Sequence, residues 1–276
     1  MATSANIVVV FDFDKTIIDC DSDNWVLDQL GLTDLFNSLL PTMPWNPLMD
    51  MLMGEVYSQG KTVDDIKRAL TNVPIHPRVV PAIKTAHALG CDLKVVSDAN
   101  MFFIQTILDH LGILECFSEI YTNPGFIDGE CRLRIHPFHS SAHGCTNPCP
   151  PNMCKGMVIK KLLSTIPEKI FIYLGDGNGD FCPSLNLREQ DYVMPRKNFP
   201  VWDLISQNTM IIKAKINEWT DGEELEHTLL RTISQLCSGF QDEGFNSQLS
   251  SADCKLQTMS TSDAREASLR TLPIPH

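Results

Sequence analysis

Long apolar runs are missing from this sequence of 276 residues. The run at 7–11 falls far short of the ~20 residues that a membrane span needs. It does not read as a signal peptide either, because no basic residue precedes it and no small-residue cleavage site follows it. We therefore expect a soluble cytoplasmic protein with no membrane partner.

Basic charge is also scarce. The chain has 22 Lys and Arg against 34 Asp and Glu, a formal charge of −12. Basic residues gather only in short pairs such as Arg196 and Lys197, which we expect to face solvent, so nucleic acid is not an expected partner. Ten cysteines in a chain of this length, without a secretion signal, indicate reduced thiols rather than a disulfide scaffold.

The apolar runs that are present have the texture of buried parallel strands. The β-branched run at 7–11 is continuously apolar, as a strand covered on both faces requires. Similar runs at 93–96, 170–174 and 192–193 each follow a plausible helix. The pattern predicts an α/β fold with a doubly wound parallel sheet, and helices near 81–88, 102–111 and 155–163.

The chain is expected to divide into three parts. Residues 23–74 contain no strand-like run and several prolines, which predicts a helical cap inserted after the first strand, over the ligand-binding end of the sheet. Residues 1–22 and 75–237 would form the α/β core, with a hairpin around 126–132. The polar segment 238–276 is predicted to be a disordered tail.

Two acidic loops follow predicted buried strands. Asp12 and Asp14 come directly after the first strand, and Asp176 and Asp180 follow the strand at 170–174 in a glycine-rich turn. Carboxylates this close together are costly unless a cation holds them, and their oxygens are ligands that Mg²⁺ prefers. Polar turns are the alternative, but they do not require carboxylates in matched loops. Asp12 is a candidate nucleophile for a phosphoryl group.

The motifs in order are Asp12-x-Asp14-x-Thr16, then Ser97, then Lys155, then Gly175-Asp176-Gly177-x-x-Asp180. This series resembles the four motifs of the haloacid dehalogenase superfamily over residues 7 to about 215. The longer strings at 10–23, 97–100 and 149–156 are similar to the phosphoethanolamine/phosphocholine phosphatase family, which includes plant members acting on inorganic pyrophosphate and relatives assigned to thiamine monophosphate.

The resemblance implies a role for each matching residue. Asp12 would be the nucleophile, and Asp14 the acid that protonates the leaving oxygen and then the base that activates water. Mg²⁺ would be held by Asp12, the carbonyl of Asp14 and Asp176, with Asp180 close by or bound through water. Lys155 would bind the phosphoryl group. Without the resemblance it reads as a solvated charge.

Ser97 has two possible roles. Its hydroxyl could hold a phosphoryl oxygen at the end of the second strand, and it could also cap the helix that begins near Met101. The two roles are compatible.

Asp23 and Asp98 are further acids that the catalytic cycle does not need, and we expect them to bind substrate. Both would lie at the mouth of the site, where a carboxylate pair stabilises a cationic head group. Trp25 and Trp45 could add an aromatic face, although core packing is the commoner role of tryptophan. Pyrophosphate would have to enter as its magnesium complex.

The segment from His136 to Cys154 contains three cysteines and three histidines. These residues could form a structural zinc site, but the C-x₃-C-x₄-C spacing is not one of the strong zinc patterns. A rigid loop with thiols packed beside the active site is the favoured interpretation.

The predicted function is that of a Mg²⁺-dependent phosphatase that hydrolyses small phosphorylated metabolites through an aspartyl-phosphate. Inorganic pyrophosphate, phosphoethanolamine and phosphocholine are the expected substrates, and thiamine monophosphate is an alternative. A phosphotransferase, a non-catalytic metal- or ligand-binding protein and a zinc-dependent interaction module are less favoured. The sequence indicates no oligomeric state.

Overall fold

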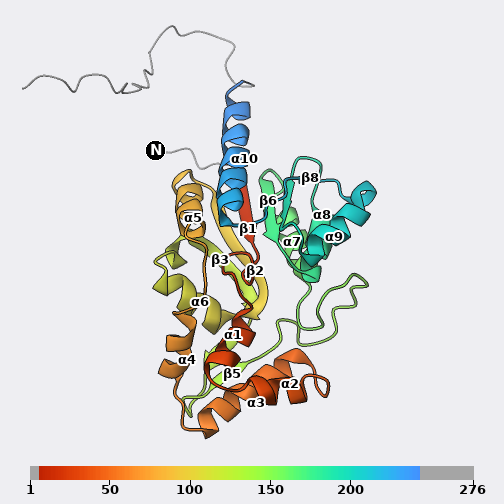
Figure 1. Cartoon of the computed structure of the whole chain (residues 1–276). Helices are drawn as coiled ribbons and strands as arrows, with labels where there is room; N and C mark the ends of the chain where they lie inside the picture. The colour runs from red at the N-terminus through yellow and green to blue at the C-terminus, as the bar shows by residue number, and fades with distance from the viewer. Residues whose placement is uncertain (1–5, 243–276) are drawn as a thin grey trace, which may run out of the picture.

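A six-stranded parallel sheet forms the centre of the molecule (Figure 1). The computed structural model of the chain describes residues 6–242. The strand order is β3-β2-β1-β6-β7-β8. In chain order the strands are β1 (Ile7–Phe11), β2 (Asp92–Asn100), β3 (Phe117–Asn123), β6 (Ile170–Gly175), β7 (Tyr192–Pro195) and β8 (Lys215–Ile216). β1 is central, and Phe11 at its end pairs with Val95 of β2 and Leu174 of β6.

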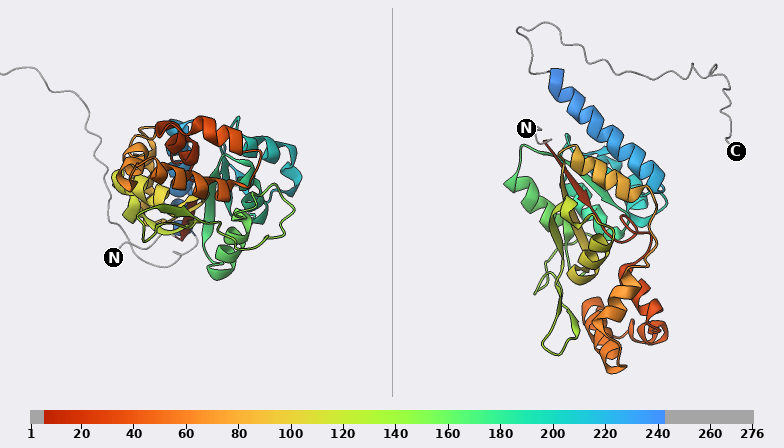
Figure 2. Two further views of the ribbon diagram at one scale, coloured as in Figure 1. Left: turned by 90° about the horizontal axis from the view of Figure 1, so that it is seen from below. Right: turned by 90° about the vertical axis from the view of Figure 1, so that its left-hand side faces the viewer.

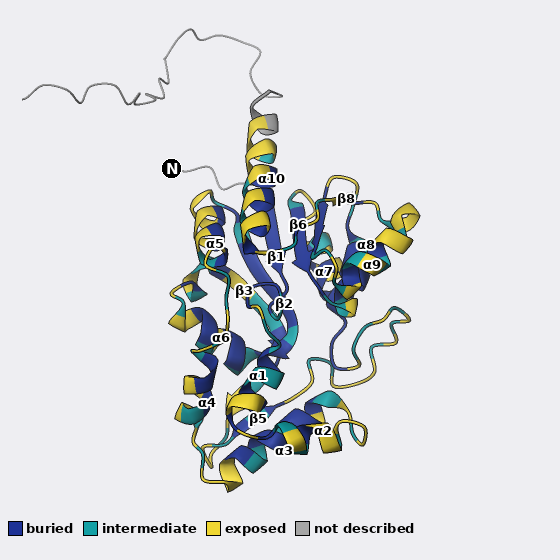
Figure 3. Cartoon of the chain, viewed as in Figure 1, coloured by how far each residue is buried: buried dark blue, intermediate teal, exposed yellow. Residues whose placement is uncertain are grey.

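Helices cover both faces of this sheet, which is why β1 is apolar throughout. Ile7, Val9 and Phe11 pack in one core with residues of α5 (Val79–Ala88), α6 (Met101–His110) and α10 (Gly222–Asp242). Val8 and Val10 pack in a second core with residues of α7 (Lys155–Thr165), α8 (Phe181–Asn186) and α9 (Pro200–Gln207). Figure 3 shows the sheet buried between the two helix layers. The predicted doubly wound α/β fold is confirmed.

Four helices lie between β1 and α5 and form a separate group beyond the carboxyl ends of the strands (Figure 2). They are α1 (Ser22–Gln29), α2 (Thr33–Leu39), α3 (Trp45–Ser58) and α4 (Val63–Leu70). The helical character expected for this segment is confirmed. Its treatment as a cap domain of residues 23–74 on a core of 1–22 and 75–237 stays a prediction.

An antiparallel hairpin joins this helical group. Strands β4 (Gly125–Ile127) and β5 (Leu133–Ile135) confirm the hairpin expected around 126–132. Asp50 of α3 accepts two hydrogen bonds from the Arg134 guanidinium, at 2.8 and 2.7 Å, and a third from the backbone N–H of Ile135 at 2.9 Å. The hairpin, which follows β3, is therefore tied to the segment that follows β1.

Some elements differ from expectation. Strands β3 and β8 are the two edges of the sheet and were not predicted, because β3 contains several polar residues and β8 has only two residues, so neither is a continuously apolar run. Short 3₁₀ turns occur at Leu114–Cys116, Asn178–Asp180 and Thr209–Ile211. The tail was expected to begin at 238, but α10 continues to Asp242. The rest of the predicted tail lies outside the described residues. No helix between 6 and 242 has the length and apolarity to cross a membrane.

Candidate active site

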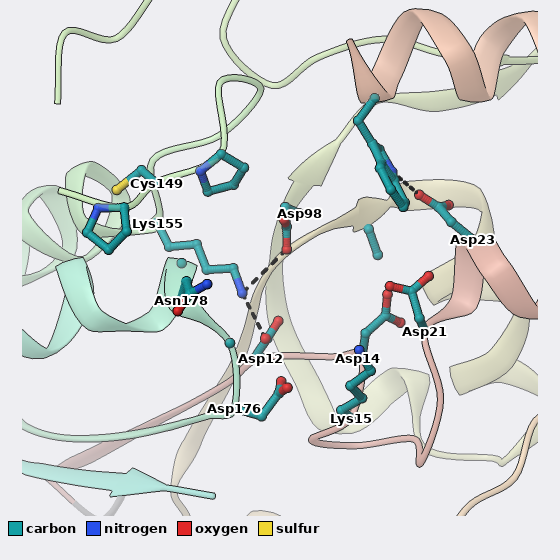
Figure 4. A pocket seen from close by; sticks show the side chains of 16 residues that line it. Asp12, Asp14, Lys15, Asp21, Asp23, Asp98, Cys149, Lys155, Asp176 and Asn178 are labelled. Atoms are coloured by element: carbon teal, nitrogen blue, oxygen red, sulfur yellow. Dashed lines mark hydrogen bonds and ion pairs between the residues drawn. The ribbon is translucent and has the colours of Figure 1, made fainter. Parts of the chain in front are cut away.

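A cavity of about 550 Å³ opens at the carboxyl ends of β1 and β6. Asp12 follows β1 and Asp176 follows β6, so neighbouring parallel strands deliver both carboxylates to the same edge of the sheet. Lys155, the first residue of α7, enters from the other side of the cavity (Figure 4). The sequence predicts that the loops containing Asp12 and Asp176 meet, and the structure shows that they do.

The chain turns sharply after β1, and this turn fixes the direction of Asp12. The backbone N–H of Phe13 donates to Asp12 Oδ1 at 2.7 Å, and the N–H of Ile17 donates to the Phe13 carbonyl at 2.8 Å. Lys15 has a φ of 54° in the left-handed region, which L-residues rarely adopt. The turn therefore places Asp12 and Lys15 at the cavity while Phe13 is buried in the core.

Asp180 organises the second acidic loop. Its Oδ2 accepts the backbone N–H groups of Asp176 at 3.1 Å and Gly177 at 2.9 Å, and its Oδ1 accepts the Tyr173 hydroxyl at 2.6 Å. Gly175 makes this possible, because a Cβ at that position would lie 2.6 Å from Asp180 Oδ2. Asp180 is fully buried, and its oxygens are occupied in orienting the loop.

Lys155 connects the two loops. Its Nζ lies 2.8 Å from Asp12 Oδ2, 2.9 Å from Asp180 Oδ1 and 3.5 Å from Asp98 Oδ1. The side chain is 2% exposed, so this is a buried ammonium among carboxylates and not a solvated surface charge. These neighbours raise its pKa well above the ordinary lysine value despite the opposing effect of burial.

The acidic cluster fits a divalent cation. Carboxylate oxygens of Asp12, Asp176 and Asp180 lie within 4.8 Å of one another, and all three residues are buried. Burial and the charge of Asp180 raise the pKa of Asp176 to about 7 and raise that of Asp12 well above its usual range, although Lys155 opposes both shifts. One ammonium does not balance the cluster, and hard carboxylate oxygens suit Mg²⁺. Asp180 already accepts from Lys155, Tyr173 and two backbone N–H groups, which favours Asp12 and Asp176 as the direct ligands, and the metal role of Asp180 stays a prediction.

Asp14 faces the same cavity from a different environment. Ser22 donates its hydroxyl to Asp14 Oδ2 at 3.2 Å, while Oδ1 is buried without a hydrogen-bond partner among the described residues. Burial, followed by the charges of Asp21 and Asp23, raises the pKa of Asp14 well above its ordinary value. A carboxyl group whose pKa is raised by burial and by neighbouring carboxylates is suited to act as a general acid.

Comparisons with known proteins show which family the chain belongs to. Residues 7–233 match the model of a family described as Putative Phosphatase. The chain belongs to this phosphatase family. It is 61% identical over 258 residues to "Inorganic pyrophosphatase 1" of Arabidopsis thaliana, which covers 90% of this chain and 86% of that protein. It is 53% identical over 240 residues to the "Thiamine phosphate phosphatase-like protein" of the same plant, covering 84% and 97%.

The fold of the phosphatase is that of haloacid dehalogenase hydrolases. A hydrolase of that family from Salmonella enterica serovar Typhi superposes with a TM-score of 0.56 at 16% identity, over 82% of this chain and 71% of the other. The resemblance drawn from the four sequence motifs is therefore confirmed, and the protein is a hydrolase of phosphorylated substrates.

The two acids expected to bind substrate both line the phosphatase cavity, and their contact with a substrate stays a prediction. Asp23 is buried, and its Oδ2 accepts the indole N–H of Trp45 at 2.6 Å. Asp98 is half-exposed and faces Lys155 (Figure 4). Trp45 lines the cavity, whereas Trp25 is half-buried, is not among the residues that line the cavity, and donates its indole N–H to the carbonyl oxygen of Ala69 in α4 at 2.9 Å.

Ser97 differs from expectation in one of its two roles. Asn100 caps α6, because its side-chain oxygen accepts the N–H of Phe103 at 3.0 Å, so the predicted cap at Ser97 is wrong. The strand continues three residues past Ser97, which places the cap later in the chain. Ser97 is buried, its Oγ accepts the N–H of Ala99 at 3.3 Å, and it is not among the described residues that line the cavity. Its contact with a phosphoryl group stays a prediction.

Two cavity residues of the phosphatase were missed. Asp21 adds a carboxylate beside Asp14 and Asp23, and Lys15 adds a second cation. Both occur within the motif strings, so a closer reading of polar residues in the turn after β1 could have found them. The solvent position expected for Arg196 is wrong, because its guanidinium lies 4.5 Å from the Phe199 ring centre and donates to the Lys15 carbonyl.

Proposed function

We propose that this phosphatase hydrolyses inorganic pyrophosphate, as its magnesium complex, through a phosphorylated Asp12. The observation that carries the proposal is the position of Asp12. This buried carboxylate follows β1, contacts Lys155, and lies close enough to the Asp176 carboxylate for the two to bind one cation. A buried carboxylate held by a lysine beside a cation site suits nucleophilic attack on phosphorus.

The first step forms a bond between an Asp12 carboxylate oxygen and phosphorus and breaks the bond between phosphorus and the bridging oxygen. Asp14 donates its proton to the leaving phosphate. In the second step Asp14, now ionised, takes a proton from water, whose oxygen attacks phosphorus and releases phosphate and free Asp12. The elevated pKa of Asp14 suits the first transfer.

A Mg²⁺ ion would be held by the carboxylates of Asp12 and Asp176 and by the backbone carbonyl of Asp14. When bound, it supplies positive charge that neutralises the phosphoryl oxygens. Asp180 orients the loop that carries Asp176 through its hydrogen bonds to the backbone of that loop. Lys155 would hold the phosphoryl group from the opposite side.

The charge of the cavity bears on the form of the substrate. Six aspartates and two lysines line it, so a bare pyrophosphate anion would be repelled. A magnesium complex carries less negative charge. The name of the relative that is 61% identical supports this substrate class for the present chain.

A second candidate substrate is a phosphate ester whose leaving group is cationic. Asp21, Asp23 and Asp98 could face an ammonium, with the Trp45 ring beside it. A second cavity of about 690 Å³ adjoins the first and shares Asp21 and Asp98 with it. Several prolines of the helical segment after β1 and of the loop before α7 line this second cavity. This space would accommodate a leaving group larger than phosphate, in line with the thiamine phosphate phosphatase-like relative.

A phosphate-release assay separates these candidates. Pyrophosphate, phosphoethanolamine, phosphocholine and thiamine monophosphate are compared by kcat/KM at fixed free Mg²⁺, with no acceptor added, so a phosphotransferase would release little phosphate. We expect pyrophosphate to have the highest kcat/KM. A cationic ester with a higher value would replace pyrophosphate as the substrate.

Asp23→Asn sharpens the comparison, because it removes the ionisable carboxyl group and keeps the shape of the side chain. The variant should lower kcat/KM for cationic esters by about tenfold, the effect of ~1.4 kcal/mol, and leave pyrophosphate hydrolysis equal or faster. Equal losses on both substrate classes would show that Asp23 does not distinguish them.

We infer a cytoplasmic location, which free thiols support. Each cysteine that the structure describes is unbridged, as expected in a reducing compartment.

A further inference from the structure

Four cysteines that the phosphatase chemistry does not use gather beside the cavity. We call Cys145, Cys149, Cys154 and Cys182 the thiol cluster. Cys149 Sγ lies 3.7 Å from Cys145 Sγ and 3.6 Å from Cys154 Sγ, while Cys182 Sγ lies 3.7 Å from Cys145 Sγ and 3.8 Å from Cys154 Sγ. All four sulfur atoms lie within 4.8 Å of one another.

These distances match the edges of a zinc tetrahedron. Four thiolates at a Zn–S distance of about 2.3 Å lie about 3.8 Å apart, and a disulfide would require about 2.05 Å. Three of the cysteines come from the loop before α7, and the fourth comes from the first turn of α8, 28 residues after Cys154. The sequence did not favour zinc, because C-x₃-C-x₄-C is not one of the strong zinc patterns, and the spacing did not indicate that Cys182 joins the cluster.

The residues around the thiol cluster leave space for its sulfur atoms and donate a hydrogen bond to one of them. Gly156 lies against Cys182, and a Cβ at that position would collide with its Sγ. The side-chain amide of Asn147 donates to Cys182 Sγ at 3.2 Å, a contact of the kind that orients metal-bound thiolates. Cys154 and Cys182 are nearly inaccessible to solvent, at 1% and 4% exposure.

The neighbouring histidines are not part of the thiol cluster, because none of them has a ring nitrogen in the group of ligand atoms that lie within 4.8 Å of one another. His143 Nδ1 accepts the backbone N–H of Cys145 at 3.1 Å, and its Nε2 lies 3.0 Å from the carbonyl oxygen of Pro150. His139 packs against Phe138, and its Nε2 is buried without a hydrogen-bond partner among the described residues. The donor set is therefore four sulfur atoms, a closed structural type that leaves no position for substrate.

We propose that the thiol cluster binds one structural Zn²⁺ ion as a tetrathiolate. The ion would tie the loop at 145–154 to α8 and thereby hold the active site together. Cys154 immediately precedes Lys155, and Cys182 lies two residues after Asp180, so both ends of the Lys155–Asp180 ion pair adjoin a zinc ligand. Cys149 also lines the catalytic cavity (Figure 4).

Metal analysis of the full-length protein tests the proposal. The protein is purified without chelator, and its zinc and iron are measured by mass spectrometry against protein concentration. We expect one zinc per chain, whether or not Mg²⁺ is present. Substoichiometric zinc, or iron in its place, would contradict the proposal.

Cys149→Ser and Cys182→Ser should each lose the ion, while the control Cys116→Ser should keep it, because Cys116 packs against the opposite core. Zinc that remains stoichiometric in Cys182→Ser would place the ion elsewhere and overturn the assignment.

A spectroscopic measurement on the wild-type chain covers the case in which those variants fail to fold. Cobalt(II) exchanged into the protein should give thiolate-to-metal charge-transfer bands and the intense visible bands of a tetrahedral ion. In the zinc form the four thiols should resist alkylation while the exposed Cys131 reacts. An octahedral cobalt spectrum, or cluster thiols that react as fast as Cys131, would rule the site out.

Discussion

Lys155 Nζ lies 2.8 Å from Asp12 Oδ2 and 2.9 Å from Asp180 Oδ1. One buried ammonium thus joins the carboxylate that ends β1 to the carboxylate that shapes the loop after β6. Both partners of a buried ion pair must be present, because removing one leaves an uncompensated charge in a region of low polarity. This relationship links the stability of the protein to the arrangement of its candidate nucleophile.

Asp12→Asn should abolish phosphate release, because the neutral amide is a poor nucleophile and a weaker ligand for a divalent cation than the carboxylate it replaces. We expect a loss of roughly 10³-fold or more in kcat, the scale seen when a nucleophile is removed from an enzyme. The circular dichroism spectrum should not change. Asp109→Asn, at an exposed position of α6, is the matched control. Activity near the wild-type level in Asp12→Asn would end the assignment.

Lys155→Met should reduce both activity and stability. The lost ammonium leaves Asp12 and Asp180 without their shared partner, at a cost of ~3–5 kcal/mol in the free energy of unfolding. Mg²⁺ should restore part of this loss by supplying positive charge. Urea unfolding with and without Mg²⁺ measures both effects, and Lys160→Met on the exposed side of the same helix should change little. Equal stability of the two variants would argue against a buried ion pair.

Tyr173→Phe should weaken the loop that carries Asp176. The hydroxyl of Tyr173 donates to Asp180 Oδ1 at 2.6 Å in a buried site, and hydrogen bonds to charged groups contribute about 1.5–3 kcal/mol. We expect a loss of that size in unfolding free energy, with a smaller effect on kcat. Tyr192→Phe is the control, because its hydroxyl only accepts a hydrogen bond from Lys215 at 3.2 Å. The account requires the larger loss at position 173.

Asp23→Asn should change how stability depends on pH. Burial, followed by the charge of Asp21, raises the pKa of Asp23 to about 7, so the folded state holds this proton more tightly than the unfolded state does. The stabilisation from Asp23 is therefore complete below its unfolded pKa of 3.8 and is lost as the pH rises through about 7. Asparagine does not titrate. Unfolding measured between about pH 5 and 8 should show the wild type losing stability relative to the variant. A difference in unfolding free energy between wild type and variant that stays constant over this pH range would contradict the raised pKa of Asp23.

The residues of the candidate site could be predicted from the sequence more accurately than the ends of the helices and strands. Asp12, Asp14 and Asp176 could be predicted because each directly follows a buried apolar run, and parallel strands bring their carboxyl ends to one edge of the sheet. The position of Lys155 came from resemblance alone, because nothing local marks a lysine that will be buried.

Other features depend on contacts that no local pattern encodes. Cys182 joins the thiol cluster only because α8 folds against the loop that contains Cys149, and Asn100 takes the helix cap because β2 extends past Ser97. Arg196 contacts Phe199 and the turn after β1, 181 residues away, although its sequence neighbourhood reads as surface.

Trapping the covalent intermediate tests the central claim most directly. The variant Asp14→Asn lacks the base for the second step but should still be phosphorylated by p-nitrophenyl phosphate, whose leaving group needs no proton. Acid quenching followed by peptide mass spectrometry should then find one phosphoryl group on Asp12. A quenched enzyme that has released p-nitrophenol yet carries no phosphoryl group, or carries it on another side chain, would contradict the account.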